Sequence, residues 1–141
     1  MSGGDEDAFE DLNDRYPGAG TFRFGDGPAL CRALTALVIA GAKTATCGAL
    51  RDFPEGEPGR PEVGRRDIAT GWDGTPRVVV ETVEIFECRF RDVPEAFALA
   101  EGAGSLAEWR AAHRAFFERG GGWAEDMWLL CERFRVVEVL G

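Results

Sequence analysis

The stretch Gly41-Ala42-Lys43-Thr44-Ala45-Thr46 decides the predicted fold, because a helix ends in it and a strand begins in it. Before it, apolar residues recur at three- and four-residue spacing and predict a helix with one buried face that begins at Pro28; they are Leu30, Leu34, Leu37 and Val38. Gly41 ends that helix because glycine accepts the left-handed conformation of a carboxy-terminal cap. Residues 44–50 favour a strand, so we expect Lys43 in the turn between the two elements.

Lys43 is the only lysine in the chain, and all the other basic residues among the sixteen are arginines. Unlike a guanidinium, an ammonium group can lose its proton in a protein and act as a base or nucleophile. A structural interpretation is also open, since a cation near a helix carboxy terminus stabilises it by a few tenths of a kcal/mol. The uniqueness of Lys43 and the hydroxyls that follow it favour the functional interpretation.

Thr46 and Glu101 are the other two candidates for catalysis. A threonine hydroxyl needs an adjacent base to act as a nucleophile, and Thr46 can meet Lys43 only if Lys43 lies outside the strand. Glu101 is expected at the end of a short helix, whose negative pole raises the pKa of a carboxyl and suits it to act as a general acid. Structural interpretations are equally open: Thr46 can be a β-branched residue that favours a strand, and Glu101 can be an exposed glutamate.

Three further residues are candidate contacts to a ligand: Thr44, Trp128 and Arg133. Thr44 adds a hydroxyl beside Lys43. Trp128 follows a glycine-rich loop and has a ring on which a base can stack. Arg133 offers a guanidinium on the last strand, although pairing with neighbouring glutamates is its simpler role.

Histidine and cysteine are too sparse to predict a metal site. His113, the only histidine, lies on the apolar face of a helix that starts with a capping box at Ser105, so we expect a hydrogen-bonded core histidine. The four cysteines are scattered without a Cys-x-x-Cys pair: Cys31, Cys47, Cys88 and Cys131. We therefore predict no metal and no other cofactor, and we expect free, buried thiols.

Composition limits the class of protein. The 141 residues suit one domain, with 45% hydrophobic residues to form its core. There is no run of about 20 apolar residues and no apolar signal core in the acidic amino-terminal region, so we expect a cytoplasmic protein without a membrane span. The formal net charge of −9 disfavours general binding to long nucleic acids and suits a small, neutral ligand.

The predicted order of elements is helix, strand, loop, hairpin, two helices and strand. Asp73-Gly74 is the hairpin signal, and residues 77–90 form a long strand with apolar residues on both faces, among them Val79 and Val83. Residues 51–64 form a loop rich in Pro, Gly and Glu, of a length typical of binding loops. Grouped helices and alternating strands predict the α+β class, with a small, partly closed β-barrel and flanking helices.

Several short motifs follow one another in an order and spacing that are specific when taken together: Phe24-Gly25-Asp26, Ala40 to Thr46, Glu101-Gly102 with Ser105-Leu106 and Trp109, His113 with Phe116-Phe117, and Asp126-Met127 with Cys131-Glu132-Arg133-Phe134. From about residue 24 to 137 the chain resembles the ASCH-domain family, whose fold is PUA-like. The resemblance implies residues 1–20 as an acidic extension, residues 21–141 as the ASCH domain, a barrel with a cleft, and an association with RNA.

A bacterial branch of that family hydrolyses N4-acetylcytidine, and its catalytic lysine, threonine and glutamate fall on Lys43, Thr46 and Glu101. The resemblance implies Lys43 as base, Thr46 as nucleophile and Glu101 as acid in a metal-independent amidohydrolase. The alternatives are an RNA-binding module and a ribonuclease that uses the same cleft. The chain departs from the family in its amino-terminal extension and its larger loop at 51–64, where Arg51-Asp52-Phe53 replaces a Trp-Glu-Tyr-like stretch.

Overall fold

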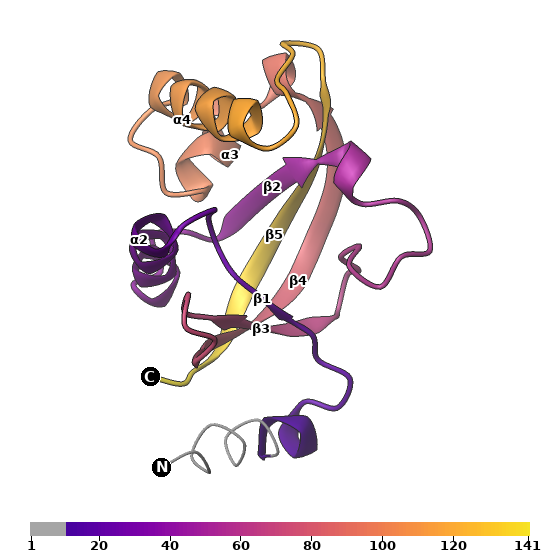
Figure 1. Cartoon of the computed structure of the whole chain (residues 1–141), viewed down its shortest axis with the longest axis vertical. Helices are drawn as coiled ribbons and strands as arrows, with labels where there is room; N and C mark the ends of the chain where they lie inside the picture. Colours follow the sequence, from indigo (N-terminus) through magenta and orange to yellow (C-terminus); the bar gives the residue numbers. More distant parts are fainter. Residues whose placement is uncertain (1–10) are drawn as a thin grey trace.

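The computed structural model describes residues 11–141 (Figure 1). After a helical turn at 11–15, the elements in chain order are β1 (Thr21–Phe22), α2 (Pro28–Ile39), β2 (Ala45–Ala49), β3 (Arg66–Thr70), β4 (Pro76–Arg89), α3 (Glu95–Ala100), α4 (Leu106–Arg119) and β5 (Trp128–Val139). Short 3₁₀ turns, Leu50–Asp52 and Phe90–Asp92, follow β2 and β4. The first half of the predicted acidic extension, residues 1–10, lies outside the described residues.

The five strands form one sheet in the order β1-β3-β4-β5-β2. β1 pairs with β3 in parallel, and the other neighbours are antiparallel. The Asp73-Gly74 hairpin between β3 and β4 forms as predicted, with Gly74 at a φ of 87°. The α+β class with flanking helices is confirmed, and the sheet is open because β1 and β2 are its two edges (Figure 1).

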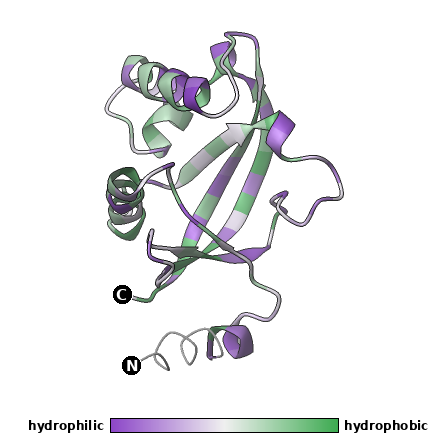
Figure 2. Ribbon diagram, viewed as in Figure 1, coloured by the Kyte–Doolittle hydropathy of each residue, from purple (hydrophilic) through white to green (hydrophobic). Residues whose placement is uncertain are grey.

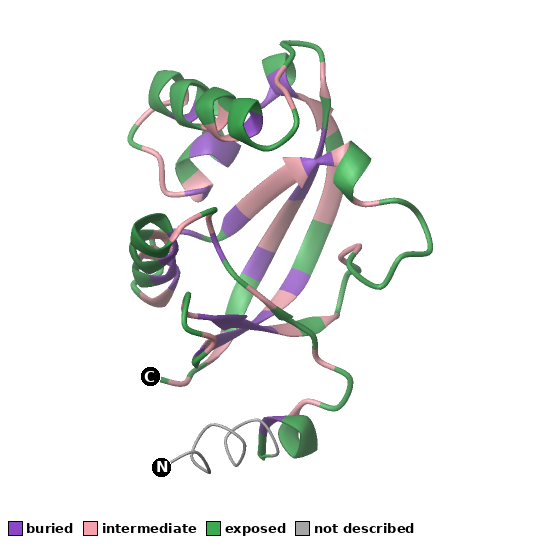
Figure 3. Cartoon of the chain, in the orientation of Figure 1, coloured by how far each residue is buried: buried purple, intermediate pink, exposed green. Residues whose placement is uncertain are grey.

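Helices cover the sheet in three places, and each contact has its own apolar core; in one of them Leu12 of the turn at 11–15 packs on Ile68 and Val79. α3 and α4 pack on one end of the sheet, where the central rings and side chains are Phe90, Phe97, Trp109, Phe117 and Leu129. α2 packs nearer the other end, against a cluster that includes Phe24, Val38, Val78 and Phe134. Figure 2 shows the alternation of hydrophilic and hydrophobic residues along β4 and β5, and Figure 3 shows the corresponding buried positions. The sheet edge at β2 therefore lies between two helical layers.

The buried face of α2 differs from the predicted one. Its fully buried residues are Cys31, Thr35 and Val38, whereas Leu30 is 36% exposed. The expectation failed at Leu30, which lines a cavity, whereas Leu34 both lines that cavity and packs against the core cluster of Phe24 and Val38.

The prediction that both faces of β4 are covered holds over only half of the strand. Val78, Val79 and Val80 are buried on both faces of the strand, but Val83 is 45% exposed. The register between β4 and β5 shifts between Thr82 and Glu84, so Val83 has no partner on β5 and is left uncovered. The alternation of apolar residues therefore overestimated how far both faces are covered.

Candidate functional site

A cavity of about 820 Å³ opens at the β2 edge of the sheet, between α2, α4 and the loop at 51–64. Its lining includes the three residues predicted to be catalytic, Lys43, Thr46 and Glu101. Five phenylalanine rings contribute apolar walls, namely Phe22, Phe24, Phe53, Phe116 and Phe134. The volume lies in the range of small-molecule sites, which are typically apolar with a few convergent polar groups.

Lys43 is held in the turn between α2 and β2. Gly41 adopts a φ of 81° and ends the helix, and the backbone N–H of Lys43 donates to the Leu37 carbonyl at 3.1 Å. The Lys43 side chain is only 3% exposed. Its Nζ donates to the Ala45 carbonyl at 2.8 Å and to the Glu101 carbonyl at 3.3 Å, and it lies 3.4 Å from Glu101 Oε1. Lys43 is thus a buried cation paired with a buried carboxylate.

Glu101 caps the carboxy terminus of α3, and its side chain is held by donors from α4. Trp109 Nε1 donates to Oε2 at 2.5 Å, and His113 Nε2 lies 3.5 Å from the same oxygen. Burial raises the pKa of Glu101, but His113, Lys43 and Trp109 outweigh burial and bring this pKa below its usual value. The expectation that the helix end raises this pKa is therefore wrong, because the donors of α4 were not included in it.

Thr46 lies on β2 and is half-buried in the cavity wall. Within the described residues, no direct hydrogen bond joins the Thr46 hydroxyl to Lys43 Nζ, which donates to Ala45 and Glu101 instead. Thr46 pairs across the sheet with Glu132 of β5, so the two side chains leave the sheet on the same face. The hydroxyl and the ion pair line the same cavity.

Glu132 is a cavity residue that sequence reasoning missed. Thr82 Oγ1 donates to its Oε1 at 2.9 Å. Burial is the main influence on this carboxyl and raises its pKa above the usual value. Its sequence signals were the alternation of the last strand and its place in the motif Cys131-Glu132-Arg133-Phe134, and neither assigned it to the cavity. The pairing with Thr46 depends on the register of β2 against β5, which local sequence does not reveal.

The three candidate ligand contacts lie outside the cavity lining. Thr44 is exposed, and its backbone joins Ala100 and Phe134 through hydrogen bonds. Trp128 is 46% exposed and stacks under the Arg89 guanidinium at 4.8 Å. Arg133 pairs with Glu84 at 3.3 Å, the simpler role expected for it.

Cys47 and His113 join Glu101 at the wall of the cavity, a grouping that their separation in the sequence concealed. One ligand atom from each of these residues lies within 4.8 Å of the others. His113 also stacks on Trp109 at 4.3 Å, and its Nδ1 is 3.0 Å from the Trp109 carbonyl oxygen. Burial raises the pKa of the Cys47 thiol well above its usual value, and Glu101 adds to this shift. The four cysteines are free, as expected, although only Cys31 and Cys131 are fully buried.

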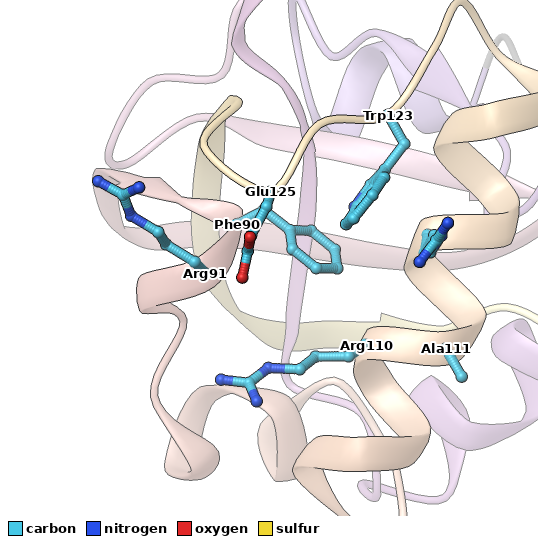
Figure 4. Close-up of a pocket in the computed structure, with 7 residues that line it drawn as sticks. Phe90, Arg91, Arg110, Ala111, Trp123 and Glu125 are labelled. Atoms are coloured by element: carbon cyan, nitrogen blue, oxygen red, sulfur yellow. The ribbon is translucent and has the colours of Figure 1, made fainter.

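A second cavity of about 400 Å³ lies on the outer side of α4 (Figure 4). Its floor is the pair of rings Phe90 and Trp123, which meet edge to face at 5.5 Å. Figure 4 shows the guanidinium groups of Arg91 and Arg110 pointing away from these rings. None of the predicted catalytic residues lines this cavity.

Comparisons with known proteins agree with this architecture. The family model described as ASCH domain matches residues 20–138. The crystal structure of an ASCH domain from Lactobacillus crispatus JV V101 is similar, with 33% identity, a TM-score of 0.78 and coverage of 90% of this chain and 84% of that one. A protein from Enterococcus faecalis V583 has 28% identity and a TM-score of 0.84, with 99% and 96% of the two chains covered.

A search of curated proteins finds no match. In the part of the chain that the structure describes, none of the helices combines the length and apolar character needed to cross a bilayer. The family match spans most of the chain and includes the helix-to-strand turn and nearly all of the cavity lining and the sheet. This chain therefore belongs to the ASCH domain family.

Proposed function

We propose that this protein is an amidohydrolase that removes an acyl group from the exocyclic nitrogen of a nucleoside such as N4-acetylcytidine. The observation that carries the proposal is the buried Lys43–Glu101 ion pair, which lies in the same cavity as the Thr46 hydroxyl. A buried ion pair adds little net stability. Its position in the same cavity as a hydroxyl suits proton transfer better than a purely structural role.

The way in which Lys43 and Glu101 share their protons defines the proposed role of the ion pair. The low pKa of Glu101 makes the ammonium–carboxylate form the resting state. When a substrate excludes water from the cavity, transfer of one proton from Lys43 Nζ to Glu101 converts the two charges into an amine and a carboxylic acid. That neutral pair contains one base and one acid, which are the two groups that acyl transfer from an amide requires.

The reaction then proceeds in two balanced steps. The Thr46 hydroxyl attacks the acyl carbonyl while its proton passes to the Lys43 amine, and Glu101 protonates the nitrogen that leaves as the carbon–nitrogen bond breaks. This step restores the ion pair and leaves an ester on Thr46. Water hydrolyses the ester, giving its proton to the Glu101 carboxylate, while Lys43 returns a proton to the Thr46 oxygen. The carboxylic acid product and the neutral pair result.

The lining of the cavity supports a ligand with an aromatic ring and polar edges. Phe53 lies over Gly48 of β2, where a Cβ atom would meet the ring at 2.5 Å, so the glycine allows this close contact. Phe24 and Phe116 supply further apolar surface on other sides. Charges of both signs also line the cavity, among them Arg65 and Asp67, which pair with each other at 2.9 Å. A small, neutral ligand suits such a balanced lining better than a polyanion does.

Incubation with N4-acetylcytidine, followed by chromatography of the released cytidine, tests the proposal. We expect release by the unmodified protein and a loss of at least about 100-fold in Thr46→Val, which keeps the shape of the side chain and removes the nucleophile. Thr75→Val is the matched control, since Thr75 is exposed in the β3–β4 turn. Equal release by the Thr46 variant, or none by the unmodified protein, contradicts the proposal.

RNA binding is the second candidate, favoured by arginines near aromatic rings. Arg23 stacks over Trp72 at 4.7 Å beside the main cavity, and Arg114 stacks over Trp123 at 4.2 Å in the second one. Such pairs suit stacked bases and phosphates. Binding of single-stranded RNA that weakens with salt and is lost in Arg23→Gln supports it. Cleavage of that RNA, lost in Thr46→Val, indicates a ribonuclease instead.

A further inference from the structure

We propose that Cys47, Glu101 and His113 bind a thiophilic divalent cation of the Zn²⁺ class at the wall of the main cavity. The proposal concerns binding by the protein alone. A consequence for catalysis, given below, rests on the proposed function.

The spacing of the three ligand atoms is close to that of a tetrahedral site. Bond lengths of about 2.0 Å to nitrogen or oxygen and about 2.3 Å to sulfur place neighbouring ligand atoms roughly 3.3–3.6 Å apart. His113 Nε2 and Glu101 Oε2 are already 3.5 Å apart. All three ligand atoms lie within 4.8 Å of one another, so a modest movement of the Cys47 side chain completes the triangle.

The hydrogen bond of His113 prepares its other nitrogen for a cation. The Trp109 carbonyl can only accept, so His113 Nδ1, at 3.0 Å, carries a proton. His113 Nε2 faces Glu101 Oε2 at 3.5 Å, and the two atoms attract each other only with a proton or a cation between them. A cation takes the place of that proton and binds the lone pair that the proton leaves on Nε2. A histidine that donates one N–H to a backbone carbonyl and ligates through the other nitrogen is the common arrangement in metal sites.

Trp109 supports two of the three ligands at once. Its carbonyl orients the His113 ring, and its indole N–H donates to Glu101 Oε2 at 2.5 Å. Trp109 is itself only 1% exposed, so packing fixes both contacts. Orientation of the ligands by a buried neighbour of this kind strengthens metal binding.

The chemistry of the ligand set selects the class of cation. One thiolate, one imidazole and one carboxylate suit zinc and similar borderline ions better than magnesium or calcium, which prefer oxygen. Binding displaces the thiol proton of Cys47 to solvent. The three residues line the cavity, so the fourth position is open to water or an added ligand.

Cation binding competes with the Lys43–Glu101 ion pair. Lys43 Nζ lies 3.4 Å from Glu101 Oε1, and a dication on the same carboxylate repels the ammonium. If the proposed hydrolase function is correct, the occupied site lacks its acid, because the Glu101 carboxylate is then a ligand of the cation and cannot hold a proton. The cation is therefore an inhibitor of the reaction and not its cofactor.

Cobalt binding to the purified, chelator-treated protein tests the proposal without any substrate. Co²⁺ serves as the probe because a cobalt–thiolate bond gives an intense near-ultraviolet absorption. We expect one equivalent to bind with this absorption, and Zn²⁺ to displace it. Cys47→Ser should lose the absorption and at least about tenfold in affinity, and His113→Gln should also bind at least about tenfold more weakly. Cys88→Ser, which changes a half-buried thiol of β4 outside the cavity, should match the unmodified protein.

Absence of the thiolate absorption in the unmodified protein overturns the site, whatever the variants do. Unchanged binding by Cys47→Ser, with circular dichroism showing a folded protein, also overturns it. The two proposals fail separately, because release of cytidine is measured in metal-free buffer. If both proposals are correct, Zn²⁺ suppresses the release of cytidine by the Cys88→Ser control. The Cys47→Ser variant should then need at least about tenfold more Zn²⁺ for the same inhibition.

Discussion

Glu101 and Glu132 line the same cavity, but their surroundings shift their pKa values in opposite directions. Glu101 has the pKa below the usual value although its side chain is only 3% exposed. Glu132 is less deeply buried and has the raised pKa. Burial favours the neutral form of both carboxyls, so burial alone does not explain the difference.

The number and charge of the donors explain the difference. The Glu101 carboxylate has three donor groups around it, from Lys43, His113 and Trp109, and the Lys43 ammonium carries a full charge. Glu132 receives the neutral hydroxyl of Thr82. A cavity that contains carboxyls in two such environments can hold one as an ion and the other as an acid at the same pH.

The largest expected effect comes from removing the charge that keeps Glu101 ionised. Lys43→Met leaves a buried carboxylate without its cation, and we expect the free energy of unfolding to fall by about 3–5 kcal/mol. Urea denaturation at neutral pH measures it. The double variant Lys43→Met with Glu101→Gln should recover most of this loss, because it leaves no buried charge.

An exposed ion pair is the control for this prediction. Arg114 and Glu118 of α4 lie 2.8 Å apart with more than half of each side chain exposed. Glu118→Gln should change the unfolding free energy by less than about 1 kcal/mol. If Lys43→Met costs no more than Glu118→Gln, the explanation by a charged donor is wrong.

A smaller effect is expected from the neutral donor of Glu101. Trp109→Phe keeps an aromatic ring and removes the N–H that reaches Oε2 at 2.5 Å. We expect a loss of about 1–3 kcal/mol in urea denaturation, since the buried carboxylate loses one hydrogen bond. Trp72→Phe changes an exposed tryptophan and should stay within about 0.5 kcal/mol. A loss in Trp109→Phe no greater than this control contradicts the prediction.

The smallest effect is a pH dependence with opposite signs for the two glutamates. The folded pKa of Glu101 is lowered, so its contribution to stability is present above the unfolded pKa and is lost as pH falls through the folded one. The folded pKa of Glu132 is raised, so its contribution is present below the unfolded pKa and is lost as pH rises through the folded one.

Urea denaturation of two variants from about pH 4 to pH 8 checks these signs, a range that spans the usual glutamate pKa. Relative to the unmodified protein, Glu132→Gln should gain stability as pH rises, by under about 1 kcal/mol. Glu101→Gln should lose relative stability over the same range. If the stability of both variants relative to the unmodified protein changes in the same direction with pH, the two glutamates do not have opposite pKa shifts.

Local signals in the sequence were sufficient for much of the fold. Gly41 ends α2, Lys43 lies in the following turn, and the Ser105 hydroxyl accepts from the Glu108 backbone, each as predicted. These features depend on residues within one turn of each other. The helix face of α2 was predicted less well, because leucines that line a cavity follow the same spacing as leucines in a core.

The charges and pKa shifts of the cavity residues could not be predicted from local sequence. The donors of Glu101 come from two other segments, and Glu132 meets Thr46 only through the register of β2 and β5. The grouping of Cys47 with His113 also depends on how α4 packs on the sheet. Such contacts follow from the tertiary structure, so the identity of the candidate residues was easier to predict than their charge.

The burial of Lys43 accounts for the unusual composition of this chain. Every arginine is at least partly open to solvent, and the single lysine is enclosed, with Nζ directed at two carbonyls and a carboxylate. A guanidinium is broader and presents its donors in a rigid plane, so it does not suit an enclosure shaped around one compact nitrogen. The exposed positions place no such demand on the shape of a cation, so arginine fits them, while this one interior position selects lysine.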